Sequence, residues 1–385
     1  MKVERIDVYT VALPFSQPER WSSGARRGCA NVLIKLTADD GVVGWGETSG
    51  GSGGSVSVIR AAVDSCVPVV VGMDPFRVEN LRSQLFSSGR WRNLHRLANL
   101  VLAGYEIACY DLMGKACGRP ASDLLGGRVR DRVSVYGYVL ADATPLMASA
   151  SADLVRRGFT TLYLKGGWDT ERDISVLTAI RQAVGPSVRI RIDANEALSP
   201  AAAISWITRL SEFDLEFVEQ PTSALDLEGM RRTREASPVP IAANQGLWSA
   251  AEAMQVIRAG AADVLVTGPL WVGGLLSLKK VAAIAEAAGL PFCRHSPPET
   301  GIATAAGLQV LATLPRLMDG NQIYLGQVLL EDVVKGGPQA SQDGHLTVPT
   351  GPGLGIEVDE EAVSRLSALY DTRGDFVQAD ESLLA

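Results

Sequence analysis

The chain has 385 residues, of which 46% are hydrophobic and 21% charged, and its formal net charge is −7. This length exceeds one ordinary small core and favours a large α/β barrel joined to a smaller domain. An acidic balance without a basic stripe argues against nucleic acid as a partner. No apolar run approaches the ~20 residues that a bilayer-spanning helix needs, so we also expect no membrane partner.

Cysteine and histidine usage bears on the compartment and on the kind of metal site. The five cysteines are scattered without a CxxC pair, which is typical of reduced thiols and predicts a cytoplasmic protein. The first residues, MKVERIDVYTVALPF, alternate like a strand and lack the layout of a secretion signal. With only three histidines, a His-rich zinc site is not expected.

Residues 1–125 are predicted to form an α+β unit. Three segments alternate or carry β-branched residues, as antiparallel strands do: 4–13, 30–38 and 41–47. Two segments have helical patterns, 57–71 and 94–118, and the second ends at Gly118 with Pro120 soon after. The Gly/Ser-rich stretch TSGGSGGS (48–55) is either a flexible linker or a mobile loop over a site.

Residues 126–340 have a different sequence pattern, in which short apolar runs alternate with amphipathic segments. The predicted strands are 133–140, 160–165, 188–193, 215–219, 240–244, 263–268, 290–295 and, more weakly, 321–326. The predicted helices between them include 173–184, 202–210, 250–260 and 277–289. Eight strands, each followed by a helix, favour a parallel (β/α)8 barrel over an open sheet, and no GxGxxG supports the doubly wound alternative. Residues 341–385 are predicted to leave the barrel and pack back on the first unit.

Near-equal spacing separates the residues that end successive predicted strands. Intervals of 28, 26, 25, 24 and 27 residues separate Lys165, Asp193, Glu219, Asn244, Gly268 and His295. Each interval is one βα unit, and the carboxyl ends of parallel barrel strands converge on one mouth, where barrel enzymes place their active sites. The spacing therefore predicts a single functional site.

An all-oxygen cluster is expected on three adjacent strands, from Asp193, Glu219 and Asn244. Hard oxygen ligands suit Mg²⁺, with Mn²⁺ as an alternative. Strand alternation places Arg189 and Arg191 on the same face as Asp193, so an interior ion-pair network is the competing interpretation.

Tyr163 and Lys165 are two residues apart and share one face of their strand. Lys165 is a candidate base, but it could also only neutralise the acids, or form a Schiff base as in barrel aldolases. Asn195 continues past the end of the strand that carries Asp193.

Several longer stretches carry a family resemblance. They are AGYEIACYDLMGKACGRP (103–120), LYLKGG (162–167), RIDANEAL (191–198), FVEQP (217–221), PIAANQ (240–245), VGG (272–274), ETGIATAA (299–306) and VPTGPGLGIEVD (348–359). With them the sequence resembles the enolase superfamily, in its muconate-lactonizing and mandelate-racemase branch, over essentially its full length. The resemblance implies an α+β capping domain, completed by the C-terminal tail, over a modified (β/α)8 TIM-like barrel.

The resemblance also implies chemistry. Members bind Mg²⁺ at three strand ends and remove the proton next to a carboxylate, giving a metal-stabilised enediolate. Asp193 and Glu219 match the first two metal ligands, and Lys165 matches the usual base, the second lysine of a paired-lysine motif. The implied partner is a small-molecule carboxylate, and because large barrels of this kind often assemble, we expect a homo-oligomer.

Three positions depart from the family pattern. Tyr163 replaces the first lysine of the pair, where it could donate a hydrogen bond, act as an unusual acid, or only fill the barrel. Asn244 stands where an acid is common, and in some branches the ligand comes one residue later, at Gln245; either amide should weaken metal binding. Gly268 stands where lactonizing members carry lysine and racemizing members aspartate. His295 matches the histidine that racemizing members pair with that aspartate.

Same-face β-elimination needs only one acid–base group, and Lys165 could serve alone. We therefore favour a Mg²⁺-dependent dehydratase acting on a hydroxylated carboxylate such as a sugar acid. A cycloisomerase or epimerase, which could use His295 on the other face, is the alternative, and a catalytically inactive binding relative is the outside alternative.

Substrate contacts are expected from four residues: Trp21, Asn195, Gln245 and Glu299. In the segment 16–28, the side chains of Arg20, Trp21, Arg26 and Arg27 could bind a second carboxylate or hydroxyl groups, or form a solvated turn.

Overall fold

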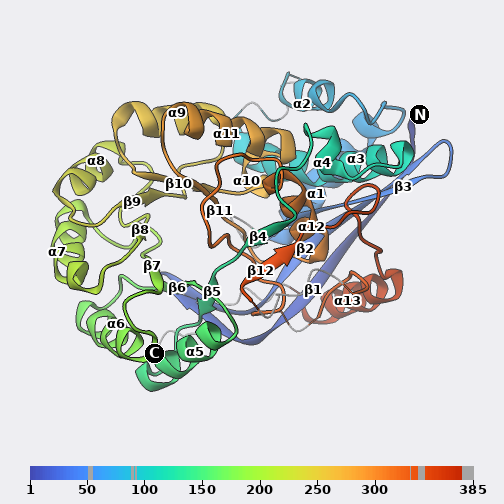
Figure 1. The fold of residues 1–385 in the computed structure, drawn as a ribbon. Coiled ribbons are helices and arrows are strands. Elements are labelled where there is room, and N and C mark those ends of the chain that lie inside the picture. The colour runs from blue at the N-terminus through green and yellow to red at the C-terminus, as the bar shows by residue number, and fades with distance from the viewer. Residues whose placement is uncertain (51–54, 88–90, 92, 330, 337–342, 375–385) are drawn as a thin grey trace.

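The computed structural model describes residues 1–50, 55–87, 91, 93–329, 331–336 and 343–374 (Figure 1). Half of the Gly/Ser-rich stretch, residues 51–54, lies outside this described part, so its predicted role as a linker or loop is not tested. Within the described residues, no helix combines the length and apolarity that crossing a membrane requires.

The N-terminal unit is a three-stranded antiparallel sheet covered by helices. Its strands, in the order β1-β2-β3, are β1 (Val3–Trp21), β2 (Gly24–Ala38) and β3 (Val43–Ser49). Its helices are α1 (Val56–Val70), α2 (Val78–Ser87), α3 (His95–Cys117) and α4 (Ala121–Leu124). A Cβ on Gly46 of β3 would lie 2.0 Å from the carbonyl oxygen of Gly104 in α3, so glycine lets α3 approach the sheet backbone to backbone.

The second unit is a curled seven-stranded parallel sheet in the order β11-β10-β9-β8-β7-β6-β5. The strands are β5 (Gly137–Val139), β6 (Thr161–Lys165), β7 (Arg189–Asp193), β8 (Phe217–Glu219), β9 (Ile241–Ala243), β10 (Val264–Thr267) and β11 (Phe292–Arg294). Figure 1 shows the connecting helices as an outer ring, which gives the modified TIM barrel that the sequence predicted.

The helices of this ring follow the strands in chain order. They are α5 (Thr144–Arg156), α6 (Thr170–Val184), α7 (Pro200–Leu210), the 3-10 turn η1 (Ser211–Phe213), α8 (Leu227–Ala236), α9 (Ala250–Ala259), α10 (Pro269–Val272), α11 (Leu275–Ala287) and α12 (Gly301–Leu311).

The predicted eighth strand, 321–326, is wrong in detail. Asn321 forms only an isolated bridge with Val135, although its N–H donates to the Ser134 carbonyl (2.9 Å). The next N–H, of Gln322, donates to the carbonyl of Arg294 in β11 (3.1 Å). This irregular segment therefore joins the two edges of the sheet and closes the barrel without being a regular strand.

The predicted strand 133–140 is divided in two. Its first part is β4 (Arg132–Ser134), which pairs antiparallel with β12 (His345–Thr347), and only β5 enters the barrel. The turn after β12 joins the N-terminal unit, because the Gly353 N–H donates to the Arg119 carbonyl (2.9 Å). The last helix, α13 (Glu360–Arg373), is tied to β2 by the ion pair between Lys35 and Glu360 (2.6 Å). The domain limits at residues 125 and 340 stay a proposal.

Candidate active site

Adjacent strand ends bring the predicted polar residues together. Lys165 is paired in register with Asp193, and Asp193 with Glu219, at the carboxyl ends of β6, β7 and β8. Asn244 follows β9, the next strand of the sheet. All four side chains are buried, although Lys165 keeps 8% of its surface exposed. Burial of a lysine beside carboxylates in a barrel mouth marks a site with a chemical task.

Lys165 and Tyr163 both bind the same oxygen of Asp193. Lys165 Nζ lies 2.6 Å from Asp193 Oδ2 and 2.9 Å from Tyr163 Oη, and the Tyr163 hydroxyl donates to Asp193 Oδ2 (2.5 Å). Burial and the neighbouring Asp193 carboxylate raise the pKa of Tyr163 well above its usual value. Tyr163 therefore keeps its proton, and its oxygen accepts the hydrogen bond from Lys165 Nζ.

Unpartnered oxygens surround this cluster. Within the described residues, no hydrogen bond reaches Asn195 Oδ1, Glu219 Oε1, Asn244 Oδ1 or Gln245 Oε1. The amide nitrogen of Asn244 donates to the carbonyl of Val266 (2.8 Å), which fixes the amide and leaves its oxygen as the free atom. Burial, and then the charge of Asp193, raise the pKa of Glu219 to about 8. Buried oxygens without donors are what a bound cation would satisfy.

The donor set fits Mg²⁺ or Mn²⁺ by its chemistry. Among the described residues, no three His, Cys, Asp or Glu side chains gather as metal ligands, and here the third oxygen belongs to an amide. The competing arginine network does not form at these acids. Arg191 Nε donates to Glu216 Oε2 (2.6 Å), and Arg189 Nη2 to Asp319 Oδ2 (3.2 Å). That interpretation of the arginines is therefore wrong.

His295 follows β11, which lies at the opposite end of the strand order from β5, and it lines the same cavity as Lys165. Its ring centre is 4.0 Å from that of Trp271, and neither ring nitrogen has a hydrogen-bond partner in the described part of the chain. Burial, reinforced by the charge of Lys165, lowers the pKa of His295 well below its usual value. His295 is therefore a neutral imidazole that packs against the tilted ring of Trp271, at an interplanar angle of 39°, and is not held by an acid.

The hairpin of β1 and β2 reaches over the barrel mouth. The hydroxyl of Ser22 at its tip donates to the Ala194 carbonyl (2.8 Å). Arg26 is buried and pairs with Glu19 Oε2 (2.6 Å), so it lies on the pocket wall, as does Trp21. The lining residues do not include Arg20 or Arg27, whose predicted place in the site the structure does not support.

Glu19 is a pocket residue that sequence reasoning missed. Its Oε1 accepts hydrogen bonds from Tyr138 (2.5 Å) and Tyr324 (2.7 Å). Burial alone would raise its pKa, but the charges of Arg26 and Lys165 and these two hydrogen bonds outweigh burial and lower it. The signal available in the sequence was an acid beside arginines within segment 16–28; its tyrosine partners come from distant segments.

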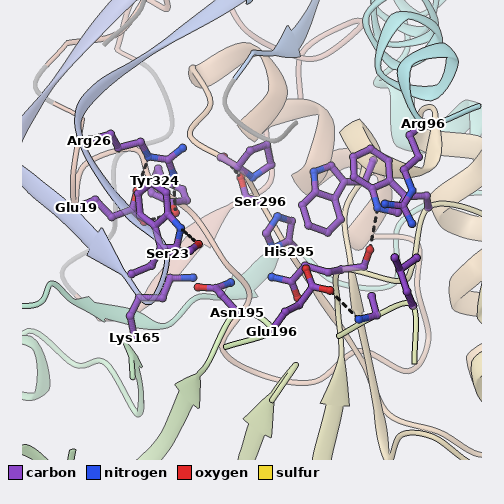
Figure 2. A pocket seen from close by; sticks show the side chains of 17 residues that line it. Glu19, Ser23, Arg26, Arg96, Lys165, Asn195, Glu196, His295, Ser296 and Tyr324 are labelled. Carbon is purple, nitrogen blue, oxygen red and sulfur yellow. Dashed lines mark hydrogen bonds and ion pairs between the residues drawn. The ribbon is translucent and has the colours of Figure 1, made fainter. Parts of the chain in front are cut away.

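A cavity of about 420 Å³ lies at this mouth, within the ~300–1,000 Å³ typical of small-molecule sites (Figure 2). Asn195 and Gln245 line it, and their contact with a substrate stays a prediction. Glu299 does not; it is fully buried, with Oε1 bound by Arg294 and by the Thr304 hydroxyl (3.1 Å).

Backbone strain gathers at the same mouth. Asn195, Glu196 and Gln220 follow β7 and β8 with φ of 47°, 67° and 36°, in the left-handed region that non-glycine residues rarely adopt. Such strain persists where surrounding structure holds it, commonly at functional sites.

Comparisons with known proteins identify the family of the chain. A family model described as the mandelate racemase / muconate lactonizing enzyme N-terminal domain matches residues 5–126, and one described as enolase C-terminal domain-like matches residues 146–362. D-galactarolactone cycloisomerase of Agrobacterium fabrum (strain C58 / ATCC 33970) is 31% identical, over 87% of this chain and 90% of that protein. Muconate cycloisomerase 1-1 of Acinetobacter lwoffii is 32% identical, over 95% of this chain and 96% of that protein.

A solved structure gives the same result. The muconate lactonizing enzyme from Pseudomonas fluorescens, complexed with muconolactone, matches with a TM-score of 0.88 and 30% identity, covering 95% of this chain and 99% of that one. The two family models together span most of the sequence, and the strand-end residues described above lie within the second. The chain therefore belongs to the mandelate racemase / muconate lactonizing enzyme branch of the enolase superfamily.

Proposed function

We propose that the chain is a Mg²⁺-dependent enzyme, with Mn²⁺ as a possible substitute, that removes the proton next to a carboxylate. Its most direct reaction is dehydration of a hydroxylated small-molecule acid such as a sugar acid. One observation carries this proposal: the amine of Lys165 lies on the cavity wall, 2.6 Å from Asp193, beside the unpartnered oxygens of Glu219 and Asn244.

Asp193, Glu219 and Asn244 would hold the metal. When bound there, Mg²⁺ supplies positive charge that offsets the negative charge developing on the substrate carboxylate. Lys165, as the neutral amine, would take the proton from the neighbouring carbon, and Tyr163 and Asp193 would hold the ammonium group that this transfer produces.

Dehydration needs no further acid. Lys165 returns its proton to the hydroxyl group on the adjacent carbon of the same face, so one C–H and one C–O bond break, a C=C bond forms and water leaves. His295, neutral and without partners in the described chain, would hydrogen-bond the substrate from the opposite wall.

Cycloisomerization or epimerization is the second candidate, because His295 offers a nitrogen on the face opposite Lys165. The names of the two cycloisomerase relatives favour it as well. We also propose a cytoplasmic homo-oligomer; the five cysteines, all in the described part of the chain, form no disulfide in the structure, and four of them are buried, which supports a reducing compartment.

The test is an NMR screen in D₂O of sugar acids, amino acid derivatives and lactones with Mg²⁺. Exchange at the α-carbon reports proton removal, while loss of the adjacent hydroxyl, ring opening and inversion distinguish the reactions. Lys165→Ala should abolish exchange, whereas truncating an exposed lysine, Lys280→Ala, should preserve it.

Three outcomes would contradict the proposal. Exchange that survives Lys165→Ala would move the base elsewhere. Substrate trapped on Lys165 by borohydride, with no effect of EDTA, would indicate Schiff-base chemistry, and absence of both Mg²⁺ binding and exchange would indicate a binding relative.

A further inference from the structure

Three cationic side chains line the cavity, and they differ in how their charges are neutralised. Lys165 has Asp193 at 2.6 Å, and Arg26 has Glu19 at 2.6 Å. Among the described residues, the nearest carboxylate oxygen to the Arg96 guanidinium group is Glu252 Oε1 at 3.9 Å, and the Arg96 side chain donates no hydrogen bond to any of them. Arg96 is therefore the cation on the pocket wall that remains available to a ligand.

The Glu252 carboxylate already has hydrogen-bond partners at the start of its own helix. Its Oε2 accepts hydrogen bonds from the Trp248 N–H (3.1 Å) and from the Ser249 hydroxyl (2.9 Å) at the start of α9. Its other oxygen is 3.5 Å from His95 Nε2. A ligand carboxylate at Arg96 would not have to break a short ion pair.

A stack of rings holds Arg96 in place. Its guanidinium carbon lies 5.3 Å from the centre of the Trp248 ring, which stacks on Trp271 at 4.7 Å and 7°. Trp271 in turn contacts His295. The guanidinium group is thus supported by a cation–π interaction with Trp248, which does not use its N–H groups as hydrogen-bond donors to another residue.

The position of Arg96 separates it from the reacting end. It comes from α3 of the N-terminal unit, its side chain is 45% exposed, and Figure 2 shows it on the opposite side of the pocket from Lys165, with His295 between them. Guanidinium groups bind carboxylates through two parallel hydrogen bonds.

We propose that Arg96 forms a second anion-binding position, and that the substrate is a dicarboxylate whose distal carboxylate binds there. This inference rests on the proposed function and narrows its substrate class from hydroxylated acids in general to diacids. Glu196 is an anionic residue that lines the same cavity, and its carboxylate accepts a hydrogen bond from the Ala224 N–H (2.7 Å). Its negative charge repels a carboxylate placed beside it, so the distal carboxylate of the substrate would bind at Arg96 and not near Glu196.

The test compares two acids that differ only at the distal end, an aldarate and the aldonate of the same configuration. Binding is measured by calorimetry with Mg²⁺ on the Lys165→Ala protein, so that turnover does not interfere. The aldarate should bind about 10- to 100-fold more tightly, the range expected for charge-assisted hydrogen bonds.

Variants then locate the effect. Arg96→Gln should erase the preference for the aldarate, and Arg96→Lys, which keeps the charge but not the two-pronged geometry, should retain part of it. Glu196→Gln should strengthen aldarate binding. Arg27→Gln makes the same charge change at an exposed hairpin residue outside the pocket lining and should leave the preference intact.

Equal affinities for the two acids, a preference that survives Arg96→Gln, or failure of the aldarate to bind would overturn the inference. Failure of the proposed function would look different: the unmodified enzyme would show no α-proton exchange with any acid, whatever its binding preference.

Discussion

The backbone of Gly268 lies against the carbonyl oxygen of His295, so closely that a Cβ at position 268 would be 2.0 Å from that oxygen. The end of β10 can therefore carry no side chain unless the end of β11 moves. The missing acid or base at this position is enforced by packing, and the wall opposite Lys165 depends on His295.

Gly268→Ala should consequently lower the free energy of unfolding by about 1–3 kcal/mol or more, the usual cost of overpacking. Chemical denaturation measures this change. Gly246→Ala is the matched control, because its Cβ would meet Ala224 at an ordinary 3.5 Å. Equal stability of the two variants would contradict the prediction.

Tyr163→Phe should lower kcat at least tenfold and shift the pH profile of kcat, because it removes the hydroxyl that orients both Lys165 and Asp193. Tyr136→Phe is the control: the Tyr136 ring stacks on Tyr163 at 4.5 Å, but its hydroxyl has no partner among the described residues. Kinetics across pH check the pair, and similar profiles for both variants would assign Tyr163 a packing role only.

Asn244→Asp should destabilise the metal-free protein but strengthen the stabilisation that bound Mg²⁺ provides. Without metal it should destabilise by about 1–3 kcal/mol, because a carboxylate oxygen replaces the donor to the Val266 carbonyl. With Mg²⁺ the added charge should tighten binding, so that the rise in Tm caused by the metal grows. Thermal denaturation with and without Mg²⁺ tests both; if Gln245→Glu alone tightens binding, the ligand is at position 245.

The raised pKa of the buried Glu106 carboxyl leads us to expect that the free energy of unfolding falls as pH rises. Burial raises its pKa to about 7, and its Oε1 accepts the N–H of Leu276 (2.8 Å) at the start of α11. The folded protein thus keeps a proton that the unfolded chain releases near pH 4.5. This contribution is full below pH 4.5 and is lost as pH rises through about 7, by roughly 3 kcal/mol at most.

Denaturation curves from pH 5 to pH 8 measure that slope, to which Glu47 adds because burial also raises its pKa to about 7. Glu106→Gln should flatten the slope. Glu228→Gln should not, because hydrogen bonding to Arg231 lowers the pKa of this exposed carboxyl and it titrates below the window.

Local patterns predicted the barrel strands β6 to β11 and the neighbours Lys165, Asp193 and Glu219, because each strand is a short apolar run with a polar end. The family motifs added the modified-barrel topology. Both kinds of signal are contained in contiguous stretches of chain.

Features that depend on distant contacts were not predictable. Whether 133–140 forms one strand or two is decided by β12, and the shape of 321–326 by the two edges that it joins. Glu299 lies in a motif, but its pairing with Arg294 keeps it out of the cavity.

The carboxylate of Glu19 lines the cavity and also bonds to both sides of the junction at which the barrel closes. Glu19 accepts hydrogen bonds from the hydroxyl groups of Tyr138, in β5, and of Tyr324, in the irregular closing segment, so it links the two sides of the junction at which the barrel closes. Laboratory evolution of new substrate preferences should therefore retain Glu19. The accepted substitutions should fall at Trp21 and Ser23, which line the same cavity but do not link the two edges of the barrel.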